Sequence, residues 1–204
     1  SFNCADCPSL ANAAVSTGQI CSGAGVALSV DVIDSDGGSL IWLDGNGQVV
    51  ANPGNVQLNN TNCAALTMSF TPQYVPTNTA CTTITLPAVT VDVFPQIVAS
   101  TDAEDCSVVL TDLPSCSNYA ITWADNLGNN GVGPVYNAVQ GTMGSVAFTI
   151  TNTEAGVPSD CQSILISSSF ACAEPVICPS LFNPQTVPAT ICAGSTFDLS
   201  VGIN

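Results

Sequence analysis

The chain repeats itself at a long step. The stretch Cys7 to Ile33, CPSLANAAVSTGQICSGAGVALSVDVI, returns without a gap at 178–204 as CPSLFNPQTVPATICAGSTFDLSVGIN, so that each residue number rises by 171. Eleven of the 27 aligned pairs are identical, where average composition gives about two. We therefore expect one whole repeat followed by the opening of the next, as in a window cut from a longer array.

A weaker duplication lies within the 171-residue repeat. The numbers of Trp42 and Trp123 differ by 81, those of Cys81 and Cys161 differ by 80, and short apolar runs follow the same order around both pairs. The repeat therefore predicts two related domains. We place the end of a preceding repeat at 1–6, the first domain at 7–95, the second at 96–177, and the first strands of the next repeat at 178–204.

The apolar residues alternate with polar ones over short stretches, which is typical of half-buried strands. In 26–32 the valines and Leu28 fall on one face, and no segment shows a sustained 3.6-residue period. We expect Thr82 to Phe94 to form a long strand with a bulge or an edge position at Pro87, and 72–78 to form a loop. About seven short strands in each domain, with one Trp on the third, predict an all-β chain of tandem immunoglobulin-like β-sandwiches.

The chain has no Lys, Arg or His and a net charge of −15, although average composition gives about 25 Lys and Arg residues at this length. Nucleic acids and anionic membrane surfaces are bound through basic residues, so neither is an expected partner. Without His, Lys or Arg, the common catalytic sets cannot form, and we do not expect an enzyme. Proteases that cut after Lys or Arg have no site. No apolar run is as long as the roughly 18 residues of a membrane span, so membrane insertion is not expected either.

Eleven cysteines without histidine indicate disulfides rather than zinc, because Cys4-x-x-Cys7 stands alone. Disulfides imply an oxidising, extracellular or cell-surface location. The repeat from 7 to 177 contains an even number, as closed pairing requires: Cys7, Cys21, Cys63, Cys81, Cys106, Cys116, Cys161 and Cys172.

Two pairing schemes remain open. Strand directions in a sandwich place the cysteines at its two poles, and pairing within poles joins Cys106 to Cys172, Cys116 to Cys161, Cys21 to Cys63, and Cys7 to Cys81. The rival scheme joins Cys7 to Cys21 and Cys63 to Cys81, with Cys178 bonded to Cys192. On the first scheme, Cys4 bonds to the preceding repeat.

Calcium is the one cofactor with a signal in the sequence. Asp34 and Asp36, and Asp44 with Asn46, place oxygen ligands on the two turns that flank the Trp42 strand. Asp102, Glu104 and Asp105 also crowd together before Cys106. No twelve-residue calcium loop is complete, and the competing interpretation is a set of turns capped by carboxylates that face water. Our expectation is therefore no cofactor, with calcium as the one alternative.

The sequence resembles the Ig-like and PKD-like repeats of very large secreted surface adhesins of Bacteroidota-type bacteria. The resemblance covers both domains and rests on three features: the C-x-G-x-x-x-x-L-x-V form of 21–30 and 192–201, the Trp of the third strand, and the closing TVDVFP of 90–95. Such proteins are tandem arrays exported to the cell surface, and the resemblance fixes no site.

These features predict a disulfide-stapled structural repeat of an extracellular filament or giant adhesin, which spans distance, bears load and resists proteolysis. Its expected partners are further copies of the repeat, in the same chain or in neighbouring subunits. The segment 178–204 cannot bury its apolar face alone, so it either continues into a longer chain or completes a neighbouring molecule by strand addition. The alternative function is a binding module that holds a glycan or a protein through its loops, with or without calcium.

Overall fold

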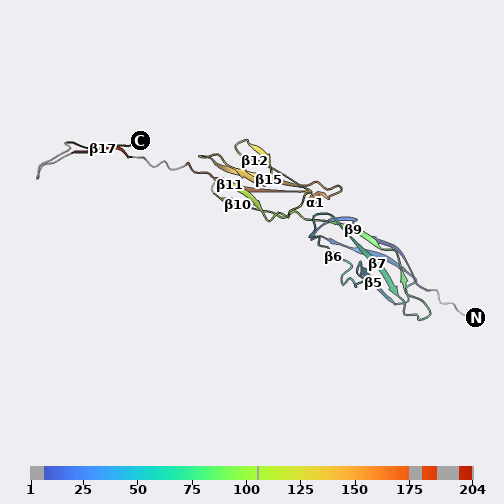
Figure 1. Cartoon of the computed structure of the whole chain (residues 1–204). Coiled ribbons are helices and arrows are strands. Elements are labelled where there is room, and N and C mark those ends of the chain that lie inside the picture. Colours follow the sequence, from blue (N-terminus) through green and yellow to red (C-terminus); the bar gives the residue numbers. More distant parts are fainter. Residues whose placement is uncertain (1–6, 105, 175–180, 188–197, 204) are drawn as a thin grey trace, which may run out of the picture.

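A computed structural model describes residues 7–104, 106–174, 181–187 and 198–203. The chain forms two immunoglobulin-like β-sandwiches arranged end to end, followed by a hairpin (Figure 1). The expected fold class, an all-β chain of tandem sandwiches, is confirmed. Its helical content in the described residues is the single turn α1 (Ser159–Gln162).

The first sandwich pairs a broad sheet with two small ones. Strands β2, β9, β7 and β5 lie side by side in that order, with β8 also on β7, and the opposite layer consists of the pairs β1–β4 and β3–β6. The strands are β1 (Ser9–Val15), β2 (Gln19–Cys21), β3 (Gly25–Val26), β4 (Leu28–Ile33), β5 (Ser39–Asp44), β6 (Val56–Gln57), β7 (Leu66–Val75), β8 (Ile84–Thr85) and β9 (Val89–Phe94).

The second sandwich has the same plan with fewer interruptions. One sheet has the order β10-β11-β14 and the other has the order β13-β12-β15-β16. The strands are β10 (Ser100–Glu104), β11 (Ser107–Thr111), β12 (Tyr119–Asp125), β13 (Asn130–Val132), β14 (Val135–Asn137), β15 (Met143–Asn152) and β16 (Ser163–Ala171).

Each sandwich has its own apolar core, built from the inward residues of both layers. In the first, Trp42 on β5 packs with residues such as Val26, Phe70 and Val91, and only 2% of its surface is exposed. In the second, Val108, Val146 and Phe148 are fully buried, and Trp123 packs against this cluster while remaining half-buried. Two separate cores are what two domains of this size require.

Two prolines of the first sandwich, Pro72 and Pro87, correct two expectations. The stretch Thr82 to Phe94 is not one strand, since it is interrupted at Pro87 between β8 and β9. Conversely, β7 runs through Pro72 to Val75, where a loop was expected. Pro72 pairs with Trp42 on one side, and on the other its carbonyl accepts a hydrogen bond from Leu86 in the gap between β8 and β9. The proline nitrogen faces that gap, where no ladder donor is needed.

The hairpin of β17 (Leu181–Val187) and β18 (Asp198–Ile203) repeats the pairing of β1 with β4. Leu181 pairs with Ile203 and Thr186 with Leu199, which match the pairs Leu10 with Val32 and Val15 with Leu28 at residue numbers higher by 171. The register shift also falls at the same place, between Phe182 and Gln185 as between Ala11 and Ala14. The repeat read from the sequence is therefore also a repeat of strand register.

Candidate functional site: the disulfide network and the domain junction

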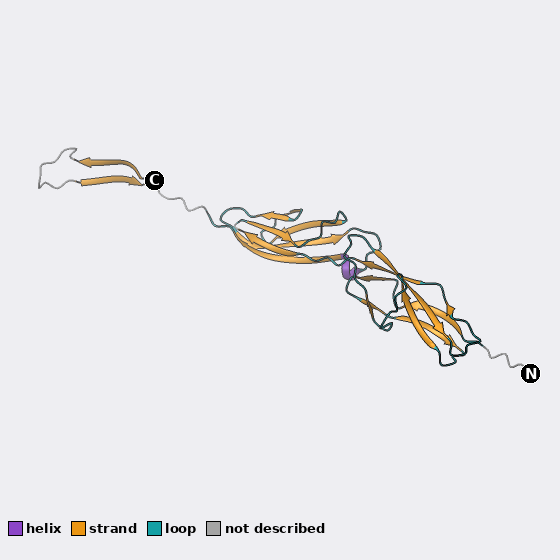
Figure 2. Ribbon diagram, turned by 60° about the horizontal axis from the view of Figure 1, so that its bottom comes forward, coloured by secondary structure: helices purple, strands orange, loops and turns teal. Residues whose placement is uncertain are grey.

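Four disulfides brace the two sandwiches at three levels. Cys7–Cys81 closes the outer pole of the first sandwich, and Cys106–Cys172 closes the outer pole of the second. Cys21–Cys161 and Cys63–Cys116 cross the junction between them, with Cα–Cα distances of 5.7 and 5.3 Å. Figure 2 shows α1, which carries Cys161, at this junction.

Two of the four predicted pairings are wrong. The structure forms Cys7–Cys81 and Cys106–Cys172 as the pole argument proposed, but not Cys21–Cys63 or Cys116–Cys161. The poles were assigned correctly, yet the inner poles of the two sandwiches face each other. Four cysteines therefore meet in one place, and each bonds across the junction instead of within its own domain. The rival scheme is also wrong for the bridges it placed among residues 7–81, while Cys4, Cys178 and Cys192 lie outside the described residues.

Polar contacts accompany the junction bridges. Both oxygens of Glu154, after β15, accept hydrogen bonds from the amide of Ala65 at 3.2 and 3.3 Å. The Nδ2 of Asn118, in the loop before β12, donates to the carbonyl of Cys63 at 2.8 Å. Burial and the nearby Glu154 carboxylate raise the pKa of Tyr119 in the same region. These contacts bring the loop of Cys63 against the second sandwich.

Asn60 fixes the same loop from within the first sandwich. It is 5% exposed, and its Nδ2 donates to the carbonyls of Ala64 and Val93 at 2.8 and 2.7 Å. Its Oδ1 accepts from the amide of Asn62 at 2.8 Å. A buried amide with its hydrogen bonds made holds a unique loop conformation. Nothing in the sequence pattern distinguished Asn60, Asn118 or Glu154 from ordinary surface polar residues.

The bridges shorten the covalent path between the two ends of the braced unit, which we define as residues 7–172. Cys21–Cys161 bypasses a sequence separation of 140 and leaves only the segments 7–21 and 161–172 on the path. A second route uses Cys7–Cys81 and Cys106–Cys172, which bypass separations of 74 and 66, and leaves only the segment 81–106. Each route bypasses a total sequence separation of 140, and the two routes have no bridge in common. The loss of any one bridge therefore leaves a path of the same length.

The residues predicted to hold calcium cap turns. Asp36 accepts hydrogen bonds from the amides of Gly38 and Asn78 at 3.1 and 2.8 Å and from the hydroxyl of Tyr74 at 2.9 Å. The amide of Asn78 is the main reason that the pKa of Asp36 falls to about 2. Asp44 uses Oδ1 to accept from the amides of Asn46 and Gln48 at 2.9 and 2.8 Å.

No group of three or more acidic or cysteine side chains suited to a metal ion occurs within the described ranges. Asp34 lies on the same turn as Asp36, and Asp102 and Glu104 are both exposed on β10. Asp105 lies outside the described residues. The arrangement around Asp36 and Asp44 is that of capped turns. The expectation of no cofactor, with calcium as the alternative, stays a prediction.

Comparison with known proteins gives fold likenesses only. No protein-family model matches the chain, and no curated protein sequence matches it. Among solved structures, it is similar to the fibronectin(III)-like modules of Clostridium thermocellum CbhA, at 11% identity and a TM-score of 0.31, over 80% of this chain and 95% of that one. It is also similar to a Dscam structure solved for isoform specificity, at 14% identity and a TM-score of 0.31. A third likeness is to the N-terminal four Ig domains of Dscam1 isoform 6.44, at 13% identity and a TM-score of 0.31.

The matched regions differ in extent. The chain is covered over 91% and 90% by the two Dscam structures but spans 56% and 55% of their own lengths. Independently of these likenesses, four disulfides are consistent with an extracellular location. None of the helical segments in the described part of the chain is long and apolar enough to cross a membrane.

Proposed function

We propose that the chain is a load-bearing spacer, the structural repeat unit of an extracellular filament or of a very large cell-surface adhesin. The observation that carries this proposal is the doubled covalent route between Cys7 and Cys172. A disulfide whose role is to stabilise one domain joins two residues of that same domain. The two junction bridges instead connect consecutive domains, and the two outer bridges supply a second covalent route. This arrangement suits a part that is pulled along its length.

The repeat supports the same proposal. The 171-residue step and the matching register of β1–β4 and β17–β18 mean that the outer pole of the second sandwich is followed by a segment built like the start of the first. Strung units of this kind give an array whose length scales with repeat number. The absence of Lys and Arg makes this unit resistant to trypsin-like proteases, whether it is folded or stretched.

Immunogold electron microscopy of the native secreted material tests the proposal. Antibodies raised against residues 7–172 should label filaments or fibrous surface material along their length, at a regular spacing set by the repeat. Antibodies against any non-repeated part of the same protein provide the control, because they should label at one position. Labelling by the repeat antibody confined to a tip, or to globular particles, would contradict a spacer role.

The alternative function is a binding module for a glycan or a protein. One observation favours it: a groove of about 570 Å³ opens on the first sandwich between β7 and the segment that contains β6. A spacer does not need such a groove. The chemistry of the groove is therefore considered separately.

A further inference from the structure

The groove lies beside a turn of the first sandwich that has an equivalent in the second sandwich, where a buried side chain occupies the corresponding space. In the first sandwich, Asp44 Oδ1 accepts hydrogen bonds from the amides of Asn46 and Gln48, and Gly47 has a φ of +77°. In the second, Asp125 Oδ1 accepts from the amides of Leu127 and Asn129 at 3.0 and 2.7 Å, and Gly128 is at φ +95°. Asp44 and Asp125 each end the strand that carries the Trp, so they are equivalent positions.

The second carboxylate oxygen distinguishes the two turns. Asp125 Oδ2 accepts from the hydroxyl of Tyr136 and from Nδ2 of Asn129, both at 2.8 Å. Burial works against the charge of Asp125, yet the hydrogen bonds from Asn129, Tyr136 and Leu127 lower its pKa. Burial and Asp125 together raise the pKa of Tyr136 to about 12. Asp44 Oδ2 accepts no hydrogen bond from the described residues, although Asp44 lines the groove.

Strand register identifies what the first sandwich has in place of the tyrosine. Tyr136 on β14 pairs with the core residue Val108, and Val56 on β6 pairs with the core residue Val26. Val56 is therefore the counterpart of Tyr136. Tyr136 is 3% exposed, and the centre of its ring lies 5.1 Å from that of Trp123 and 5.0 Å from that of Phe170.

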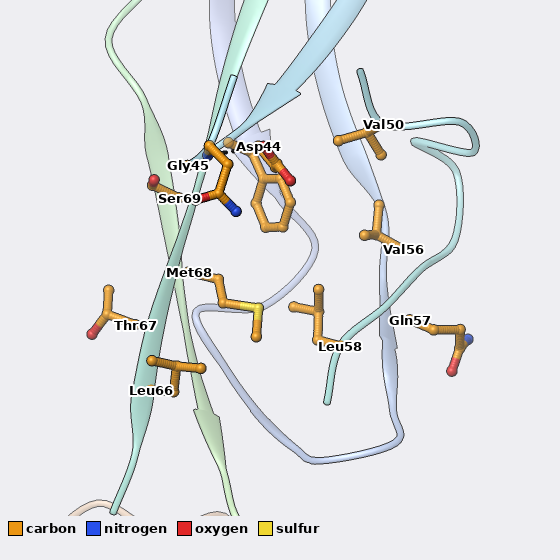
Figure 3. A pocket seen from close by; sticks show the side chains of 12 residues that line it. Asp44, Gly45, Val50, Val56, Gln57, Leu58, Leu66, Thr67, Met68 and Ser69 are labelled. Atoms are coloured by element: carbon orange, nitrogen blue, oxygen red, sulfur yellow. Dashed lines mark hydrogen bonds between the residues drawn. The ribbon is translucent and has the colours of Figure 1, made fainter. Parts of the chain in front are cut away.

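The walls of the groove suit an aromatic ring. The floor includes Phe70 and Leu58, which are 3% and 4% exposed, and Met68, Val50 and Val56 are half-buried around it. Figure 3 shows Met68, Leu58 and Val56 extending toward one another across the groove, whereas Thr67 points away from it. Phe70 on β7 occupies the position of Val146 in the second sandwich. The first sandwich therefore has its large residue on β7, whereas the second has Tyr136 on β14, and a groove remains beside β6.

From these equivalences we propose that the groove binds the phenolic ring of a tyrosine presented by a partner protein, with the ring against Phe70 and Met68 and the hydroxyl donating to Asp44 Oδ2. The partner is not another copy of this unit. The chain has three tyrosines; Tyr74 and Tyr136 are buried and Tyr119 is half-buried. The net charge of −15 further favours a tyrosine flanked by basic residues. This inference is independent of the load-bearing role, which needs no ligand.

Methionine-methyl NMR of the oxidised full chain tests the proposal directly. The chain has two methionines; Met68 lines the groove, whereas Met143 is 76% exposed on the second sandwich and serves as the internal control. The probes are N-acetyl-tyrosinamide and N-acetyl-phenylalaninamide, which differ by the hydroxyl alone. The tyrosine probe should shift Met68 saturably and leave Met143 unchanged. It should bind roughly tenfold more tightly than the phenylalanine probe, as expected for a hydrogen bond to a carboxylate.

Two variants complete the test. Asp44→Asn keeps an acceptor oxygen for the turn but removes the charge, and it should bring the affinity for the tyrosine probe close to that for the phenylalanine probe. Val56→Tyr combined with Phe70→Val copies the second sandwich and should abolish binding, because the internal tyrosine then occupies the site. Equal binding of the two probes to the unmodified chain, equal shifts of Met68 and Met143, or no saturable shift of Met68 would each overturn the proposal, whether or not the variants fold. p-Cresol is the free-phenol arm: binding of p-cresol without N-acetyl-tyrosinamide would also overturn it, since a partner's tyrosine carries its backbone.

Discussion

Pulling the braced unit from its two ends should reveal the doubled covalent route. The perturbation is the replacement of chosen cysteine pairs by serine. A stretched chain spans at most about 3.6 Å per residue, so the roughly 25 residues left by either route limit the oxidised unit to about 90 Å. With all bridges reduced, the whole backbone from Cys7 to Cys172 is released, and the limit rises to about 590 Å. The oxidised chain should therefore show no unfolding step as long as about 90 Å, because a step equals this limit minus the length of the folded unit.

The variants separate this connectivity from a general loss of stability. Removing both junction bridges, Cys21–Cys161 and Cys63–Cys116, leaves the route through the outer bridges and should not lengthen the unit. Removing Cys21–Cys161 together with Cys7–Cys81 leaves a longer path, which follows the segment 7–63, crosses to Cys116 and returns along 106–116. That path of about 66 residues raises the limit to about 240 Å. Both variants lose two bridges and four cysteines, so the number of bridges lost is the same and the remaining connectivity differs.

Single-molecule force spectroscopy, with handles joined enzymatically to peptide tags at the ends of the full chain, measures these lengths. Comparison between variants cancels the contribution of the flanking residues. A step longer than about 90 Å in the oxidised parent would contradict the doubled covalent route. Equal lengthening of the two double-bridge variants would contradict it as well.

Three further predictions follow from the bridges and the turns. Peptic digestion without reductant should yield peptides that join the two sandwiches through both junction bridges, and mass spectrometry that found only bridges within each sandwich would contradict the connectivity. The pKa of Asp36 is about 2 in the folded chain against an ordinary value of 3.8, so Asp36 stabilises the fold above pH 4 and this stabilisation is lost as the pH falls toward 2. Asp36→Asn should flatten the fall in melting temperature over that range, whereas Asp34→Asn, on the same turn, should leave it unchanged; equal profiles would count against the assignment. Calcium and a chelator should give the same melting temperature, because Asp36 and Asp44 already accept hydrogen bonds from backbone amides. A higher melting temperature with calcium would support calcium binding at these residues.

The alternation of apolar and polar residues and the spacing of the repeats predicted much of the fold, because both are visible in the order of residues along the chain. The alternation over 26–32 places Val26 and Leu28 in the core, and the matched positions of Trp42 and Trp123 locate the same strand in both sandwiches. Pro72 shows the limit of such reasoning. A proline normally ends a strand, yet here a gap in the neighbouring strands accommodates its missing donor.

The amino-acid sequence was enough to predict the all-β class, the 171-residue step, the duplication within it and the pole at which each of the eight bridged cysteines lies. These can be read along the chain from its period, its composition and the order of the expected strands. The three-dimensional arrangement was needed to show that the inner poles face each other, so that Cys21 bonds to Cys161 and Cys63 to Cys116. It also decided that Val56 stands where the second sandwich has Tyr136, which leaves a groove beside Asp44. Both outcomes depend on which surfaces meet in space, and residues far apart in the chain carry no local sign of their partners.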